Sequence, residues 1–322
     1  MDSTAPKFYP FYDPYRDGNM LSMYAKVGIA LSFGLSYIFL QFAVMPDKAE
    51  YFQQSLWILG AIISTSIMAI YAATMAFRKI LLTIGRLEGT QRICEDTIAT
   101  WLTDSKLLMA GVAFGTLNTL MGHLLGVPLT FQDSVPTFAV MYIGFFMSGF
   151  FAGMGLQAIF AVLALHLKFA PNLQHSLDPD NPDGSGGIGT IGDSLWFFAL
   201  LIGAVGVLVS IYLVNVRWSF MYKEYVQLIY MFWISFPYVM AVSIVLIPGL
   251  AVRKQVSGFK DFRAQQLKQE QAKLYSSYKE FADGDDDEII SSKKELEERM
   301  ENIENQMQKL RDMRNSHIDG KR

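Results

Sequence analysis

Six long apolar segments divide the first three quarters of the chain, and a polar tail follows them. None of the six contains Asp, Glu, Lys or Arg, and they span residues 27–45, 56–77, 107–127, 137–167, 195–216 and 228–250. A helix of about 20 apolar residues crosses the hydrocarbon core of a bilayer. Uninterrupted apolarity does not fit a membrane barrel, whose strands alternate apolar and polar residues. The pattern therefore predicts an all-α polytopic membrane protein with six transmembrane helices.

The same pattern divides the chain into three parts. Residues 1–25 form a polar and aromatic N-terminal tail, residues 26–252 a six-helix transmembrane domain, and residues 253–322 a helical tail. Nothing at the N-terminus is typical of a cleaved signal peptide, so we expect the first span to act as its own insertion signal. Helical spans without an organelle signal favour a plasma membrane or a bacterial inner membrane.

Basic residues beside the spans predict the orientation. Thirteen Lys and Arg lie on one side, against three on the other. Those on the first side are Lys7, Arg16, Lys26, Arg78, Lys79, Arg86, Arg92, Lys106, Lys168, Arg253, Lys254, Lys260 and Arg263, and those on the second are Lys48, Arg217 and Lys223. Because loops rich in Lys and Arg remain cytoplasmic, we expect both termini in the cytoplasm.

The tail predicts two helices joined by an acidic break at residues 283–287. From residue 289 onward, apolar residues recur in heptads, with Ile289, Leu296, Ile303 and Leu310 at d positions and Met300 and Met307 at a positions. A heptad seam is typical of packed helices. The two helices could form an antiparallel hairpin within the chain or a coiled coil between chains. Lys293 and Arg314 at the other a positions weaken a long parallel seam, which favours the hairpin.

Charge and chemistry exclude several classes of protein. The net charge of −3 is unlike that of a nucleic-acid-binding protein, and the single Cys94 excludes an internal disulfide. Ser148 lies within a span but does not indicate a serine hydrolase, because the sixth segment has no histidine to act as its base. His123 and His166 lie toward opposite membrane faces and cannot share a haem. We expect no catalytic residues.

The loop before the fifth segment carries unusual chemistry, namely four carboxylates and several glycines. Its candidate site residues are Asp178, Asp180, Asp183, Gly187, Gly189, Gly192 and Asp193. Clustered carboxylates suit Ca²⁺, but the spacing does not match an EF-hand, and a turn without an ion is the favoured interpretation. The chain therefore predicts no metal site, with Ca²⁺ as a weak alternative. A glycine-rich loop at a helix N-terminus also suits anions, although we expect Asp193 to cap that helix instead.

Neutral polar residues in the second and third segments are candidates to line a narrow hydrated pathway. They are Ser64, Thr65, Ser66, Thr116, Asn118, Thr119 and His123. Hydrogen bonding between helices, or back to the preceding helical turn, is the alternative role and the favoured one. The spans hold no carboxylate, which argues against proton-coupled transport and voltage sensing.

Small residues in the fourth segment predict close helix packing. Gly144 and Ser148, like Gly149 and Gly153, are four residues apart, a spacing that lets helix backbones approach. We expect them to pack within one subunit rather than between subunits.

Two functions remain open from the sequence. The first is a homo-oligomeric channel or pore, assembled or gated through the cytoplasmic helices. The second is a non-conducting membrane anchor or scaffold that recruits a cytosolic protein through residues 254–315. Both require the lipid bilayer as a partner, and neither requires a cofactor or nucleic acid.

Overall fold

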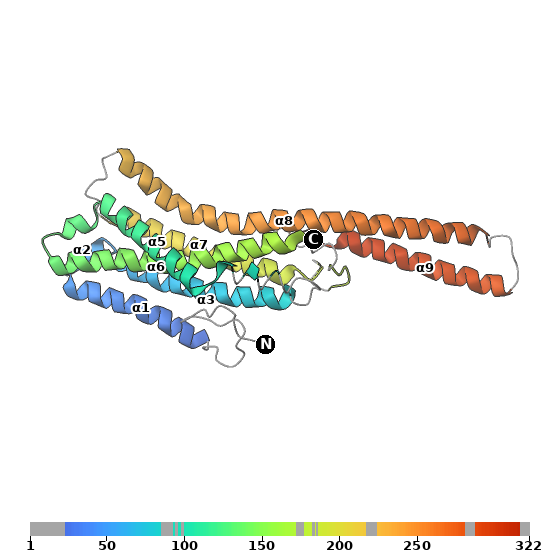
Figure 1. The fold of residues 1–322 in the computed structure, drawn as a ribbon, viewed down its shortest axis with the longest axis horizontal. Coiled ribbons are helices and arrows are strands. Elements are labelled where there is room, and N and C mark those ends of the chain that lie inside the picture. The colour runs from blue at the N-terminus through green and yellow to red at the C-terminus, as the bar shows by residue number, and fades with distance from the viewer. Residues whose placement is uncertain are drawn as a thin grey trace.

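The computed structural model is helical throughout the residues that it describes (Figure 1). These are residues 23–84, 93, 96, 97, 100–171, 177–181, 184, 186–216, 224–280 and 287–315. The helices are α1 (Met23–Val44), α2 (Lys48–Gln53), α3 (Ile58–Ile84), α5 (Asp104–Leu124), the 3₁₀ helix η1 (Pro128–Phe131), α6 (Val135–Phe169), α7 (Gly189–Asn215), α8 (Glu224–Glu280) and α9 (Asp287–Asp312). No strand occurs among the described residues, and the predicted all-α class is confirmed.

Five of the described helices are long and apolar enough to cross a membrane: α1, α5, α6, α7 and the first part of α8. The described side chains of α3 form a shorter apolar stretch, Ile58–Ala72. Each of these helices coincides with one apolar segment of the sequence. Several apolar helices of this length are typical of a membrane-embedded protein.

Helices α3 and α6 lie at the centre of the bundle. Helix α6 packs against α1, α3, α5 and α8, while α3 packs against α1, α6 and α7, and α7 packs against α8. In the most apolar window of α6, 61% of the residues are buried, compared with 22–28% in the other four candidate spans. The outer helices therefore keep most of their apolar residues on the surface.

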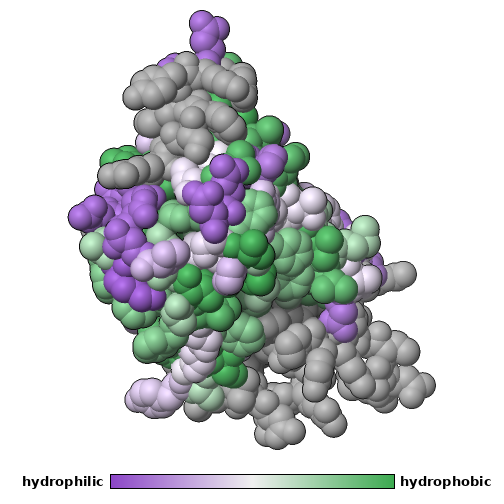
Figure 2. Space-filling model, turned by 90° about the vertical axis from the view of Figure 1, so that its left-hand side faces the viewer, coloured by the Kyte–Doolittle hydropathy of each residue, from purple (hydrophilic) through white to green (hydrophobic). Residues whose placement is uncertain are grey.

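Those outward faces are suited to lipid rather than to water. Large exposed side chains on α1, α5, α7 and α8 include Phe39, Met109, Leu200 and Met231. Contiguous exposed apolar surface of this kind marks a membrane or protein contact in a folded chain. Figure 2 looks onto the end of the bundle that carries the α1–α2 and α7–α8 connections, where hydrophilic side chains gather among hydrophobic ones.

The start of α7 differs from the sequence-based expectation. Helix α7 begins at Gly189, with Ile188 as its N-cap residue and no side-chain cap, so Asp193 lies inside the helix. The prediction that Asp193 caps this helix is therefore wrong. Gly189 and Gly192 adopt helical geometry because their neighbours pack into the bundle, where Ile188 and Leu195 are buried.

Helix α8 joins the sixth apolar segment to the tail without a break. It runs for 57 residues and contains Pro237 and Pro248. Figure 1 shows the helix bending in its first half, the half that contains both prolines, as expected where a proline removes a backbone hydrogen bond.

Helix α9 lies antiparallel to the second half of α8 (Figure 1). Leu267 of α8 is buried against Ile303 and Leu310 of α9 in a small apolar core of its own. Toward the tip, the Tyr278 hydroxyl donates a hydrogen bond to Glu297 Oε1 over 3.0 Å. This bond and the nearby carboxylate charge raise the pKa of Tyr278 above its usual value. We call α9 together with the second half of α8 the helical hairpin.

Candidate functional site: an interhelical cavity and the hairpin root

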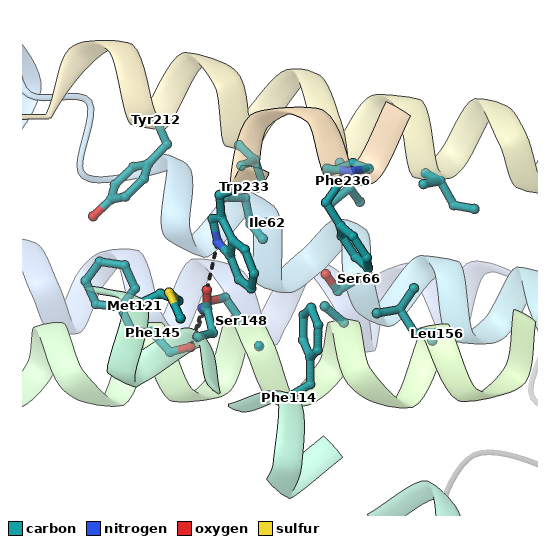
Figure 3. A pocket seen from close by; sticks show the side chains of 18 of the residues that line it. Ile62, Ser66, Phe114, Met121, Phe145, Ser148, Leu156, Tyr212, Trp233 and Phe236 are labelled. Carbon is teal, nitrogen blue, oxygen red and sulfur yellow. Dashed lines mark hydrogen bonds between the residues drawn. The ribbon is translucent and has the colours of Figure 1, made fainter. Parts of the chain in front are cut away.

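A cavity of about 120 Å³ lies inside the bundle (Figure 3). Residues of α3, α5, α6, α7 and α8 line it, and nearly all of the lining is apolar. It is shaped by small residues on α6, where Gly149, Ala152 and Gly155 leave space beside the larger side chains of the other helices. A cavity of this size in a protein interior accommodates a small apolar molecule.

Aromatic side chains line the cavity between α5 and α8. The ring of Phe114 on α5 stacks on Trp233 of α8, with centroids 5.8 Å apart and planes at 17°. Phe236, one turn further along α8, lies 6.2 Å from the same Phe114 ring. Stacked rings at these distances attract one another beyond their burial. The side of the cavity between α5 and α8 is thus held by three aromatic side chains.

Asn118 links three helices at the wall of this cavity. Its Nδ2 donates to the Phe145 carbonyl over 2.7 Å and to Ser148 Oγ over 3.0 Å, both on α6. Its Oδ1 accepts from Trp233 Nε1 of α8 over 3.2 Å. A primary amide has two donor hydrogens, and both are engaged here. Asn118 therefore holds α5, α6 and α8 together.

Two hydroxyls on the cavity wall have no hydrogen-bond partner among the described residues. Ser66 on α3 is 2% exposed and Tyr212 on α7 is 3% exposed, and the oxygen of each is buried. In Figure 3 the Ser66 hydroxyl is seen between the rings of Phe114 and Phe236, while Tyr212 lies at the far end beside Phe145. A buried polar group without a partner is costly, and native structures contain few of them.

The structure separates the residues that the sequence suggested for a pathway. Ser66 and Asn118 meet at the cavity. Thr65 instead donates to the Ala61 carbonyl of its own helix. Ser64 faces Gly34 of α1. A Cβ added to Gly34 would lie 1.9 Å from the Ser64 hydroxyl oxygen.

The other three pathway candidates lie on the outer surface between α5 and α6. Thr116, Thr119 and His123 line a shallow groove there, opposite Tyr142. His123 Nδ1 and the Tyr142 hydroxyl are 2.7 Å apart, within hydrogen-bonding distance. Thr119 donates to the Gly115 carbonyl one turn earlier. In the isolated chain, the pathway candidates other than Thr65 thus occupy the cavity, the α1 contact and this outer groove.

The small residues of α6 contact neighbouring helices of the same chain. A Cβ at Gly149 would come within 2.6 Å of Asn118 Cβ, and one at Gly153 within 2.5 Å of the Ala110 carbonyl, both on α5. Gly144 makes room for the Tyr37 hydroxyl of α1. Ser148 accepts from Asn118. These four positions therefore serve contacts within the subunit.

The loop before α7 receives the returning end of the hairpin. Asp180 forms an ion pair with Lys309 of α9, with 2.6 Å between the charged atoms. The backbone N–H of Arg314 donates to the Gly184 carbonyl over 2.8 Å. Met313 between these two contacts is buried in the main core of the bundle. We call these contacts the hairpin root.

The remaining loop candidates play local roles in the described part of the chain. Asp178 Oδ1 accepts from the backbone N–H of Asp180, which closes a turn. Gly187 has a φ of +94°, a conformation that favours glycine, whereas Gly189 begins α7 and Gly192 is buried within it. Asp183 lies outside the described residues. Among those that are described, no group of three potential metal ligands comes together.

The heptad residues of α9 are buried to different degrees. Ile303 and Leu310 are buried against α8, and Met307 packs beside them. Leu296 and Met300, nearer the tip, are only partly buried. The side chain of Ile289 lies outside the described residues.

The sequence did not single out Phe114, Tyr212, Trp233 or Phe236 as site residues. Aromatic residues are common in apolar spans, so their presence alone predicts core packing. Only the contact between α5 and α8 brings three of them together.

Comparison of the chain with protein-family models, with curated proteins and with solved structures finds no match.

Proposed function

We propose that this protein is a six-span membrane anchor that presents its helical hairpin to a partner protein in the cytoplasm. The six spans are the apolar parts of α1, α3, α5, α6, α7 and α8. The excess of Lys and Arg beside the hairpin end of the bundle supports a cytoplasmic position for both termini. The start of α1 and the end of α9 both lie toward this end in Figure 1.

The continuity of α8 is the observation that carries the proposal. One helix passes from the apolar segment directly into the hairpin, and the hairpin root ties the other end to the loop before α7. The hairpin is thus attached to the bundle at two points. Its polar half extends about 40 Å past the last apolar residues of α8. Such an element holds a surface at a fixed distance and orientation from the membrane.

The surface of the hairpin offers anchors for a protein partner. Phe262 and Tyr275 lie on its polar part. Although both are large aromatic residues, their side chains are 60% and 65% exposed. Leu267, by contrast, is used in the contact with α9. Exposed aromatic side chains on an otherwise polar helix are typical of positions that dominate the energy of a protein interface.

Affinity capture from native membranes tests the proposal. Proteins captured by the full chain are compared with those captured by a Phe262→Ala, Tyr275→Ala double variant and by a Gln265→Ala, Glu270→Ala control on the same helix. We expect a specific partner to be lost only with the aromatic variant. Capture that does not change when residues 254–322 are deleted would contradict the proposal.

A homo-oligomeric channel or pore is the second candidate, and one observation favours it. The groove of Thr116, Thr119 and His123 faces outward from the bundle, where polar groups in contact with lipid are unfavourable. A neighbouring copy of the chain would cover these groups. The number of subunits in native-like lipid and recordings in planar bilayers test this candidate. A monomer that conducts no current under varied ions and potentials would exclude it.

A further inference from the structure

We infer that the cavity among α3, α5, α6, α7 and α8 is a binding site for a ring-sized apolar molecule that carries one hydrogen-bonding oxygen. This site is independent of the hairpin and of the proposed anchor function. Three properties define its ligand, namely the volume of the cavity, the character of its walls and the unpartnered hydroxyl of Ser66.

The volume limits the ligand to about the size of one ring. The cavity measures about 120 Å³. An apolar protein cavity of comparable size, about 150 Å³, remains dry and binds benzene. A complete lipid chain is larger than this space.

The walls select an apolar and preferably aromatic ligand. Phe114 and Phe236 present their rings to the cavity, and Leu156 of α6 lies near them (Figure 3). Gly155, one residue before Leu156, also lines the cavity. The space beside Gly155 is open, because a Cβ added to this residue would have only Ile70 within 4 Å, at 3.8 Å. A ring in this position would stack against aromatic side chains at ordinary contact distances.

Ser66 supplies the polar element of the site. Its hydroxyl is buried and lacks a partner among the described residues, in contrast to the hydroxyl of Thr65, which bonds back to its own helix. Asn118 does not compete for the ligand, because its amide is already engaged with α6 and α8. A ligand oxygen beside Ser66 would restore the missing hydrogen bond, which predicts that a phenol binds more tightly than the same ring without a hydroxyl.

Access from the lipid is available between α5 and α8. The two helices meet there through Phe114, Trp233 and Phe236. Rotation of aromatic side chains is a smaller change than separation of helix backbones, so a ring-sized molecule dissolved in the bilayer can enter at this point. Trp233 then lies beside the bound molecule and reports its presence.

Fluorescence quenching of the full chain in lipid nanodiscs tests the site. The probes are 4-bromophenol and bromobenzene, whose bromine quenches tryptophan at short range. Gly155→Leu fills the cavity, whereas Gly203→Leu on α7 adds the same side chain where a Cβ meets nothing within 4 Å. Probe dissolved in lipid quenches every variant equally. A saturable component that is present in the wild type and in Gly203→Leu but lost in Gly155→Leu is the expected result.

A Ser66→Ala variant tests the hydroxyl separately, with Ser235→Ala as its control on α8. We expect 4-bromophenol to bind about three to ten times more tightly than bromobenzene, and this preference to disappear only in Ser66→Ala. Saturable quenching that persists in a folded Gly155→Leu variant overturns the site. Equal binding of the two probes to the wild type, or a preference that survives Ser66→Ala, overturns the assigned ligand chemistry. If Gly155→Leu does not fold, the comparison of Ser66→Ala with the wild type still decides whether the Ser66 hydroxyl binds the probe.

Discussion

The bundle and the hairpin are both built from antiparallel helices, but the helices are held together in different ways. In the bundle, Gly149 and Gly153 bring the backbone of α6 so close to α5 that a single methyl group would collide. In the hairpin, Leu267, Ile303 and Leu310 keep the helices apart and fill the space between them. The bundle thus packs by close backbone approach and the hairpin by a seam of large apolar side chains.

The solvent expected around each region explains the difference. In water, a Leu or Ile gains free energy simply by leaving the solvent, so a narrow apolar seam suffices. In lipid that gain is absent, and helices associate through close packing and hydrogen bonds. The outward faces of the two regions agree with this explanation. Helices α1, α7 and the first part of α8 expose large apolar side chains, whereas most residues on the outside of the hairpin are polar.

The largest effect is expected from filling the close contact in the bundle. A Gly149→Leu substitution places its side chain against Asn118 Cβ and the Phe114 carbonyl, and backbone cannot yield as a flexible side chain can. We expect a loss of about 3 kcal/mol or more of stability, seen as a much lower melting temperature in lipid nanodiscs. Gly203→Leu is the matched control and should behave as the wild type. Similar melting temperatures for the two variants would show that close α5–α6 packing is not required.

A smaller effect is expected when a charge enters the seam of the hairpin. Ile303→Asp buries a carboxylate against Leu267, so α9 should separate from α8 while the bundle remains folded. Hydrogen exchange of the α9 amides should rise at least tenfold in this variant. Asn302→Asp adds the same group at the exposed neighbouring position and should leave the exchange unchanged. Protection of α9 in the Ile303→Asp variant would mean that other contacts hold the hairpin.

Removal of the polar link in the bundle should cost less. Asn118→Ala abolishes its bonds to the Phe145 carbonyl, to Ser148 and to Trp233. Hydrogen bonds between membrane helices contribute on average about 0.6 kcal/mol each, so we expect a total loss of about 1–2 kcal/mol in thermal unfolding. Thr119→Ala removes a hydroxyl that donates to a carbonyl of its own helix and should have little effect. Equal losses in the two variants would argue against a special role for Asn118.

The smallest effect is expected at the ion pair of the hairpin root. Asp180 and Lys309 are both more than half exposed, and exposed ion pairs contribute about 0–1 kcal/mol. Lys309→Ala should therefore change hydrogen exchange near the root by less than about fivefold. Met313→Asp should have a clearly larger effect, because Met313 is buried in the main core. A larger effect of Lys309→Ala than of Met313→Asp would show that the ion pair, rather than apolar burial, stabilises the hairpin root.

Several features of the fold followed from local sequence alone. Uncharged runs long enough to cross a bilayer predict helices wherever they occur, and each of the six runs coincides with a described helix. The spacing of Gly149 and Gly153 similarly indicates a face that another helix can approach. The heptads of α9 predict the residues that α8 covers, including Ile303 and Leu310.

Other features depended on contacts between distant segments. The start of α7 at Gly189 differs from the start expected at Asp193, because burial of Ile188 and Leu195 outweighs the preference of an aspartate for a capping position. The predicted pathway residues are close in sequence but point in different directions around their helices. Whether a polar residue of α5 faces the cavity, like Asn118, or the outer groove, like Thr119, depends on which helix lies beside it.

The apolar helices, their lengths and the unequal numbers of Lys and Arg beside their two ends follow from the sequence, because they depend on residues that are near one another in the chain. Which polar groups find partners depends instead on the helices that pack beside them. Asn118 found partners on α6 and α8, and Ser66 found none among the described residues. The cavity beside them is space left between five helices, and no single helix encodes the volume that its neighbours leave unfilled.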